Sequence, residues 1–182
     1  MDELIDIVDE QGNYTGKTCL KSKAHKFGYF HPTVHIWIYT KDHKILLQQR
    51  AFTKKVFPGL WDISVAGHIG AGEIIEEAAI REVEEEIGFK VKPENLIKIG
   101  TRKHQVNHPN GIIDNEFHHV FITELNVPVE ELIIQESEVA GLQLYDLDIL
   151  NKTSEYENVL LPEYSQYYES VFTAIIAKTE KS

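Results

Sequence analysis

The sequence has little sulfur, little positive charge and no long apolar run, and each shortage excludes something. Its 182 residues include one cysteine, Cys19, so no disulfide can form within the chain, which suits a reducing cytoplasm. The 18 lysine and arginine residues face 29 acidic residues, and the net charge of -11 argues against a nucleic-acid-binding surface. The chain opens without a basic segment followed by apolar residues, and no stretch approaches the length of a membrane span. We therefore expect a cytoplasmic protein with no signal peptide and no membrane partner.

The remaining composition and its patterning predict one α/β domain over residues 1–182. The chain is 42% hydrophobic and 26% charged, which is ordinary for a globular domain with a full core. Residues 21–28 are ambiguous, and 51–62 are expected to form a loop. An amphipathic C-terminal helix is expected within about 155–179, with its periodic part between Pro162 and Lys178. Strands are predicted, the first two as a hairpin, at 4–8, 14–20, 34–40, 45–49, 96–106, 113–125 and 139–145.

The most informative segment runs from Gly67 to Phe89 and contains G-x5-E-x7-R-E-U-x-E-E-x-G-U, where U is apolar. Because a helix turns by about 100° per residue, Glu82, Glu85 and Glu86 fall on one side of the helix predicted here. Like charges at this spacing repel one another, whereas a hard divalent cation prefers carboxylate oxygens and would bind between them. For a lone E-x-x-E-E we would favour a solvated acidic face.

The residues around these glutamates favour the metal-site interpretation. Arg81 is placed to orient a carboxylate, and Glu73 is expected to open the helix, where negative charge suits the helix dipole. Gly67 precedes the helix and allows the backbone to approach an ion closely. An adjacent apolar stripe is expected to pack on a sheet, which places Glu86 at its edge as a partly desolvated carboxylate facing a cleft. The stripe consists of Ile75, Ala79, Ile80, Val83 and Ile87.

This segment resembles the motif of the Nudix hydrolases, which cleave a nucleoside diphosphate linked to another group. The resemblance implies an α/β/α sandwich with a mixed β-sheet and a small-molecule diphosphate substrate. It also implies Mg²⁺ or Mn²⁺ held by Glu82, Glu85 and Glu86 with the carbonyl of Gly67. Enzymes of this kind are often dimers, so a homodimer is a further expectation.

From about Leu4 to Tyr145 the chain also resembles the isopentenyl-diphosphate isomerases, which share the Nudix fold. The matching segments include Lys21-Ser-Lys-Ala-His25, Phe30-His31, Gln49-Arg50 to Trp61, Ser64 to His68, and Gly111 to Phe121. The resemblance implies that Arg50 and Lys54, with Lys55 beside them, bind the substrate's diphosphate. It implies one further divalent metal held by His25, His31, His68, Asp114 and Glu116, and neutral imidazole favours zinc or manganese there.

Three departures distinguish the chain from these isomerases. Ala66 occupies the position of their catalytic cysteine, and alanine can neither donate nor accept the proton that alkene isomerisation requires. Asp114 replaces their usual glutamate, and one residue is missing between His25 and His31. These changes point to a hydrolase on an isomerase-like frame, with Glu116 or one helix glutamate accepting a proton from the attacking water. An isomerase, an isoprenoid diphosphate hydrolase and a non-enzymatic diphosphate-binding module are the alternatives.

Overall fold

The computed structural model describes residues 2–152, 159–161 and 164–180. The chain begins with an antiparallel hairpin of β1 (Leu4–Val8) and β2 (Tyr14–Leu20), which confirms the predicted N-terminal hairpin. The Asp9 carboxylate accepts backbone N–H groups of Gln11 and Asn13 and so fixes the tight turn between the two strands. Helix α1 (Lys21–Phe27) follows and carries His25 towards the main sheet.

The main sheet has seven strands, and it is mixed, as predicted. The central strands β3 and β8 run parallel, whereas every other pair in the sheet is antiparallel. The order is β5-β4-β3-β8-β7, with β6 also pairing with β3 and β9 with β4. Its strands are β3 (His31–Tyr39), β4 (Lys44–Arg50), β5 (Trp61–Asp62), β6 (Val65–His68), β7 (Ile97–Asn107), β8 (Ile113–Glu124) and β9 (Val139–Asp146).

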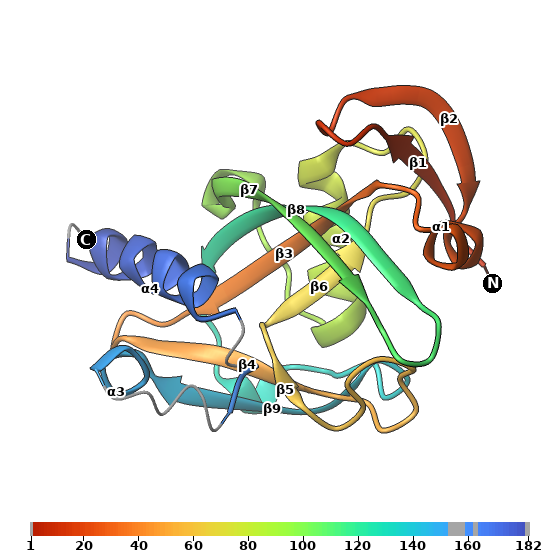
Figure 1. The fold of residues 1–182 in the computed structure, drawn as a ribbon. Helices are drawn as coiled ribbons and strands as arrows, with labels where there is room; N and C mark the ends of the chain where they lie inside the picture. The colour runs from red at the N-terminus through yellow and green to blue at the C-terminus, as the bar shows by residue number, and fades with distance from the viewer. Residues whose placement is uncertain (1, 153–158, 162–163, 181–182) are drawn as a thin grey trace.

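Helices cover both faces of this sheet, which confirms the predicted α/β class (Figure 1). Successive residues of β3 point to opposite faces, so the strand contributes to two cores. Val34 and Ile36 pack with α2 (Ile75–Ile87), whereas Trp37 packs with α4 (Ser165–Thr179). We call these the α2 face and the α4 face.

The structure also differs from the predicted elements. The ambiguous residues 21–28 contain helix α1, which ends at Gly28 in a left-handed conformation with φ of 67°. The predicted loop contains β5, and a helix α3 (Leu147–Lys152) follows β9 without having been expected. Short 3₁₀ turns lie at Pro93–Asn95 and Val129–Glu131. Residues 155–158, Pro162 and Glu163 of the expected C-terminal helix lie outside the described residues, and α4 begins at Ser165.

Within the described ranges, no helix combines the length and the apolar character that crossing a membrane requires.

Candidate active site

Close packing between β6 and α2 places the first part of the site. Gly67 lies on β6 directly against Glu82, and a Cβ atom at residue 67 would overlap the Glu82 carboxyl group. Helix α2 begins after Ile74 and ends at Gly88, whose φ of 68° is left-handed. The expectation that Glu73 opens the helix is wrong, because Glu73 precedes it. Its carboxylate instead accepts a hydrogen bond of 2.8 Å from the backbone N–H of Gly70.

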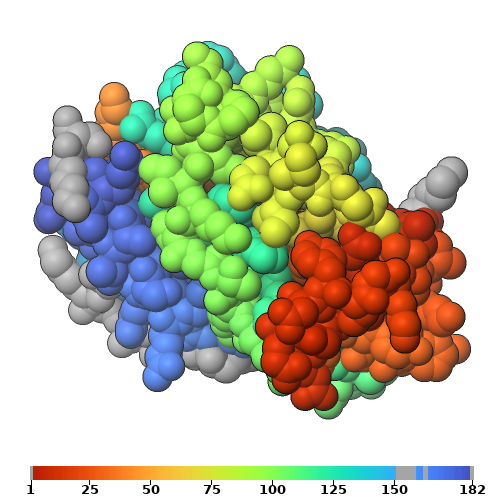
Figure 2. All heavy atoms as spheres, turned by 90° about the horizontal axis from the view of Figure 1, so that it is seen from above, coloured from red at the N-terminus to blue at the C-terminus, as the bar shows by residue number. Residues whose placement is uncertain are grey.

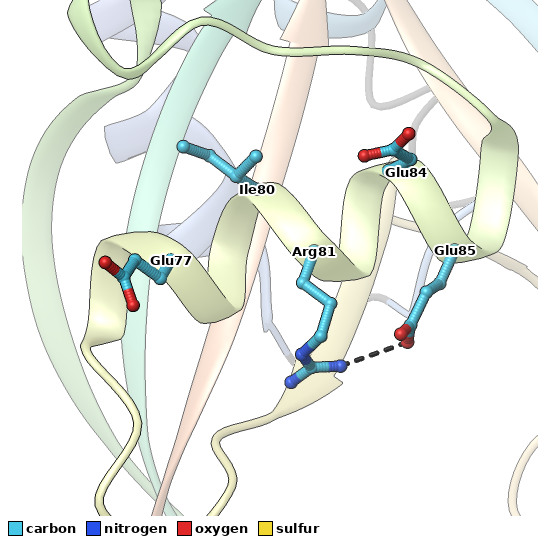
Figure 3. A pocket seen from close by; sticks show the side chains of 5 residues that line it. All are labelled: Glu77, Ile80, Arg81, Glu84 and Glu85. Atoms are coloured by element: carbon cyan, nitrogen blue, oxygen red, sulfur yellow. Dashed lines mark hydrogen bonds and ion pairs between the residues drawn. The ribbon is translucent and has the colours of Figure 1, made fainter.

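Arg81 joins the loop before α2 to the acidic face of the helix. Its Nε and Nη2 donate to the two carboxylate oxygens of Glu73 at 2.8 and 2.9 Å, a bidentate arrangement. Nη1 donates to Glu82 at 2.9 Å and to Glu85 at 3.0 Å, and Nη2 also reaches the His68 carbonyl at 3.0 Å. Figure 3 shows Arg81 and Glu85 side by side on α2. Both residues line a pocket of about 420 Å³. Arg81 thus contacts three carboxylates, as the predicted role of orienting a carboxylate requires.

Glu82 and Glu86 are buried, whereas Glu85 is exposed. Burial, reinforced by the neighbouring charge of Glu82, raises the pKa of Glu86 to about 8. The side-chain amide of Gln48 donates to Glu86 Oε2 at 3.2 Å. Burial also raises the pKa of Glu82, although Arg81 opposes that shift. The partly desolvated carboxylate predicted for Glu86 is thus present, and a divalent cation is the kind of ligand that would compensate its burial as an anion.

Two of the three cations predicted to bind diphosphate have acidic partners within the protein. Arg50 donates to Asp62 Oδ2 at 2.9 Å and to the Val56 carbonyl at 3.0 Å. Lys54 forms an ion pair with Glu138, and its charge lowers the pKa of Glu86, which places it electrostatically beside the acidic site. Lys55 is exposed. Their role towards a substrate stays a prediction.

A second cluster lies on the α4 face and draws on four separate elements. Its members are His25 from α1, His31 from β3, His68 from β6 and Glu116 from β8, and one ligand atom of each lies within 4.8 Å of those of the others. His25 Nε2 lies 3.1 Å from His68 Nε2, and Glu116 Oε1 lies 3.6 Å from His31 Nε2 and 4.0 Å from His68 Nε2. Among the described residues, this is the one group of histidine, cysteine and acidic side chains gathered so closely. We call it the histidine group.

Two members of the histidine group, His31 and His68, suit the role of a metal ligand. His31 Nδ1 donates to the Tyr29 carbonyl at 2.9 Å, which leaves Nε2 with a free lone pair in the neutral ring. That Nε2 atom is buried and has no hydrogen-bond partner. Burial holds the pKa of His68 well below its usual range, which favours the neutral ring at that residue. Neutral imidazole nitrogens beside a carboxylate form a suitable donor set for zinc or manganese.

Asp114 is not a member of the histidine group but stands behind it. Its Oδ1 lies 2.8 Å from His25 Nδ1, and its Oδ2 lies 2.7 Å from His108 Nε2. Burial alone would lower the pKa of His25, but Asp114 and Glu116 raise it. Asp114 therefore orients His25 in the structure, a different position from the direct ligand that the isomerase resemblance implied.

Sequence reasoning missed two residues beside this group, His118 and Lys21. His118 Nε2 lies 2.9 Å from Glu116 Oε2. Burial alone would raise the pKa of Glu116, but His118 and His31 outweigh that effect and hold the pKa well below its usual range. The sequence does indicate the position of His118, because residues 116 and 118 of one strand lie on the same face of the sheet. Lys21 also belongs to the site electrostatically, since its charge lowers the pKa of His68. His119 faces away from His118 and lies opposite Thr101, whose hydroxyl is 3.3 Å from its ring nitrogen.

The chain is similar in sequence and in fold to known Nudix proteins. A NUDIX domain model matches residues 29–164. An uncharacterized Nudix hydrolase from Clostridium acetobutylicum is 37% identical over 152 residues, which cover 82% of this chain and 72% of that protein. An isopentenyl-diphosphate Delta-isomerase from Serratia proteamaculans is 35% identical over 122 residues, 67% of this chain and 66% of its own. The NUDIX domain of Shewanella oneidensis NrtR, solved with ADP ribose, shares the fold at 19% identity with a TM-score of 0.58, covering 79% of this chain and 87% of that one.

Proposed function

The chain belongs to the Nudix hydrolase family, and we propose that it cleaves the diphosphate linkage of a nucleoside diphosphate derivative or a related organic diphosphate with the help of Mg²⁺ or Mn²⁺. The observation that carries the proposal is the burial of Glu86, 5% exposed, beside Glu82 in a complete Nudix motif. A buried pair of carboxylates is costly without a cation, and a merely solvated acidic helix would leave both exposed.

In this proposal Glu82, Glu85 and Glu86 hold the cation with the Gly67 carbonyl, and Arg81 keeps two of the three carboxylates in place. When bound, the cation neutralises charge on the diphosphate oxygens and lowers the pKa of water. Glu116 or one of the helix glutamates accepts the proton of the attacking water. Lys54, whose charge acts on Glu86, binds the non-attacked phosphate in this proposal, and the substrate then replaces Glu138 as its partner. Arg50 would likewise release Asp62 and bind the same phosphate.

The histidine group supplies a second candidate cation site, on the α4 face. Its residues are His25, His31, His68 and Glu116, and the unpartnered Nε2 of His31 supports a metal ligand rather than a purely structural cluster. Glu116 would then serve both as a ligand and as the base nearest the second ion.

An isomerase of isopentenyl diphosphate is the alternative, and the 35% identity to such an enzyme favours an organic diphosphate among the substrates. Ala66 argues against the isomerase reaction itself. It pairs with His35 across β6 and β3 and offers a methyl group at the position of the isomerase cysteine. A hydrolase of isoprenoid diphosphates retains the similarity without requiring that cysteine.

The decisive experiment is a phosphate and diphosphate release screen with Mg²⁺ and with Mn²⁺. The panel contains nucleoside diphosphates and triphosphates, nucleotide sugars, ADP-ribose, dinucleotides, and isopentenyl and dimethylallyl diphosphates. We expect hydrolysis of one class, and dimethylallyl diphosphate formed from isopentenyl diphosphate would instead establish the isomerase.

The matched variant is Glu86→Gln, which we expect to lower turnover by about 100-fold or more, since it removes a metal-holding charge from the site. Its fold should survive, because a neutral amide replaces a carboxylate whose burial raises its pKa to about 8. Near wild-type activity in this variant would overturn the assignment. Size-exclusion chromatography with light scattering tests the homodimer that we also propose. Cys19 is a free thiol, consistent with the cytoplasmic location included in the proposal.

A further inference from the structure

Arg102 lies on β7, one strand away from the histidine group. The register of β7 with β8 places Arg102 opposite His118, and His104 opposite Glu116. Directly opposite residues share a face of the sheet, so Arg102 and Glu116 are diagonal neighbours with Cβ atoms roughly 7–8 Å apart. Arg102 therefore lies within the length of a small ligand from the proposed catalytic carboxylate.

Two tyrosines at the start of α4 hold the guanidinium group of Arg102. Its Cζ lies 5.0 Å from the centre of the Tyr164 ring and 4.7 Å from that of Tyr167. Tyr167 is itself fixed, because Trp37 Nε1 donates to its hydroxyl at 2.8 Å and His35 Nδ1 lies 2.9 Å from the same oxygen. The two rings thus hold the guanidinium group in place, and such cation–π contacts leave its N–H groups available to an acceptor.

Arg102 also differs from Arg50, Lys54 and Arg81 in lacking an acidic partner. Arg50 is paired with Asp62, Lys54 with Glu138, and Arg81 with three glutamates. Within residues 2–152, 159–161 and 164–180, no carboxylate lies within ion-pair distance of Arg102. In a chain with a net charge of -11, a half-buried arginine held by aromatic rings and left without a counter-ion is poised for an external anion.

A pocket adjoins this arginine. It has a volume of about 290 Å³ and lies between residues 99–102 of β7 and residues 166–174 of α4. Figure 2 shows β7 (green) running beside α4 (blue) across this surface. Arg102 is the one charged side chain in its lining, and the other walls combine apolar groups with four neutral polar residues, Thr101, Gln166, Tyr167 and Ser170. Such a lining suits an oxyanion carried on a partly apolar group.

We propose that Arg102 and this pocket form an anion subsite, which binds a phosphate or carboxylate on the part of the substrate attached to the scissile diphosphate. The identity of the ligand as substrate rests on the proposed hydrolase function, but the binding of an oxyanion does not. A bidentate contact from the guanidinium edge supplies the recognition, and the two tyrosines supply its orientation. A substrate with such a second anionic group is a nucleotide-like or phosphorylated compound rather than a simple prenyl diphosphate.

The first test measures binding of inorganic phosphate to the metal-free protein by isothermal titration calorimetry, with sodium acetate as a second probe. We expect the dissociation constant for phosphate to rise about 10-fold or more in Arg102→Met, which keeps the apolar stem, and less in Arg102→Lys, which keeps the charge. Lys98→Met is the matched control, since it removes a cation from the same strand that lies over the Phe121 ring. Wild-type phosphate affinity in a folded Arg102→Met protein would overturn the proposal. Tighter binding of acetate than of phosphate would identify a carboxylate as the anion.

The second test uses the substrate that the release screen identifies. Arg102→Met should raise KM about 10-fold and leave kcat nearly unchanged, because the subsite binds ground state and transition state alike. Prenyl diphosphates as substrates, with equal KM in wild type and variant, would overturn the subsite while leaving the hydrolase intact. Phosphate binding that depends on Arg102 in a protein without hydrolytic activity would retain the subsite and reject the proposed function.

Discussion

The two faces of β6 carry two different kinds of polar site. On the α2 face, Gly67 lies against Glu82, and the site is built from acidic side chains held by Arg81. On the α4 face, His68 joins two other imidazoles and one carboxylate. Adjacent residues of one strand therefore serve hard carboxylate chemistry on one side and imidazole chemistry on the other. The difference teaches that one strand can present carboxylate oxygens on one face and imidazole nitrogens on the other, and these are ligand types that different cations prefer.

The largest effect expected in this comparison comes from Gly67→Ala, which attacks the α2 face alone. The added methyl group would overlap the Glu82 carboxyl group, so Glu82 or the strand has to move. A displacement of about 1 Å at a catalytic group can cost about 100-fold in rate, and we expect at least that loss of turnover. Overpacking should also lower the free energy of unfolding by about 1–3 kcal/mol, measured by urea denaturation.

Gly141→Ala is the matched control for this substitution, because a Cβ atom at residue 141 would meet only Gln49 Oε1 at 3.8 Å, an ordinary van der Waals contact. It should leave both turnover and stability near those of the wild type. Full activity of Gly67→Ala would mean that the close approach of β6 to Glu82 has no part in catalysis.

A smaller and more selective effect is expected from His31→Gln, which attacks the α4 face. Loss of the unpartnered Nε2 should weaken binding of Zn²⁺ or Mn²⁺ at the histidine group by about 10- to 100-fold. Titration calorimetry with each ion measures this change. His119→Gln is the control, because that ring lies on the same strand as Glu116 but faces the other way.

The comparison holds if Glu86→Gln leaves the ion affinity of the histidine group unchanged while it abolishes turnover. Equal weakening of zinc binding by Glu86→Gln and by His31→Gln would instead show that both residues belong to a single site.

The two faces also differ in how far the sequence could predict them. The acidic site lies within one continuous segment, where helical spacing alone places Glu82, Glu85 and Glu86 together, so the helix and the burial of Glu86 could be predicted. The histidine group depends on tertiary pairing among α1, β3, β6 and β8, which no local period reveals. The resemblance to the isomerases supplied its residues, and the structure supplied their proximity.

Predictions failed or stayed incomplete where a long-range partner decides the outcome. Glu73 precedes the helix it was expected to open, because Arg81 and the Gly70 N–H group bind its carboxylate. Arg50 pairs with Asp62, a contact between β4 and β5 that an expected loop could not foreshadow. Helix α1 was ambiguous because its seven residues are too few for a clear apolar stripe.

The pH dependence of stability should also separate the two faces, because burial raises the pKa of Glu86 from 4.5 to about 8. A carboxyl group with a raised pKa in the folded state favours folding while it is protonated. Its contribution is therefore complete below about pH 4.5 and is lost as the pH rises to about 8. Relative to Glu86→Gln, the metal-free wild type should lose stability across this window, with a slope of up to about 1.4 kcal/mol per pH unit.

Urea denaturation of both proteins between pH 4 and pH 9 measures that difference. Saturating Mg²⁺ should abolish it, since the cation binds the ionised carboxylate. A difference that stays constant across the series would place Glu86 in a solvated environment and remove the main physical argument for the acidic site.

The smallest effect is expected from substitution of His118, which contacts the histidine group without belonging to it. His118 Nε2 lies 2.9 Å from Glu116 Oε2, so that Oε1 is the oxygen turned towards His31 and His68. His118→Phe removes this contact and should weaken ion binding at the histidine group about 10-fold. His118→Gln keeps a nitrogen donor at a similar reach and should restore most of the affinity. Equal losses in both variants would show that the imidazole acts by filling space against His35, whose ring centre lies 3.8 Å away. Wild-type ion affinity in both variants would show that the contact from His118 does not affect Glu116. Ion binding at the histidine group would then depend on its four members alone.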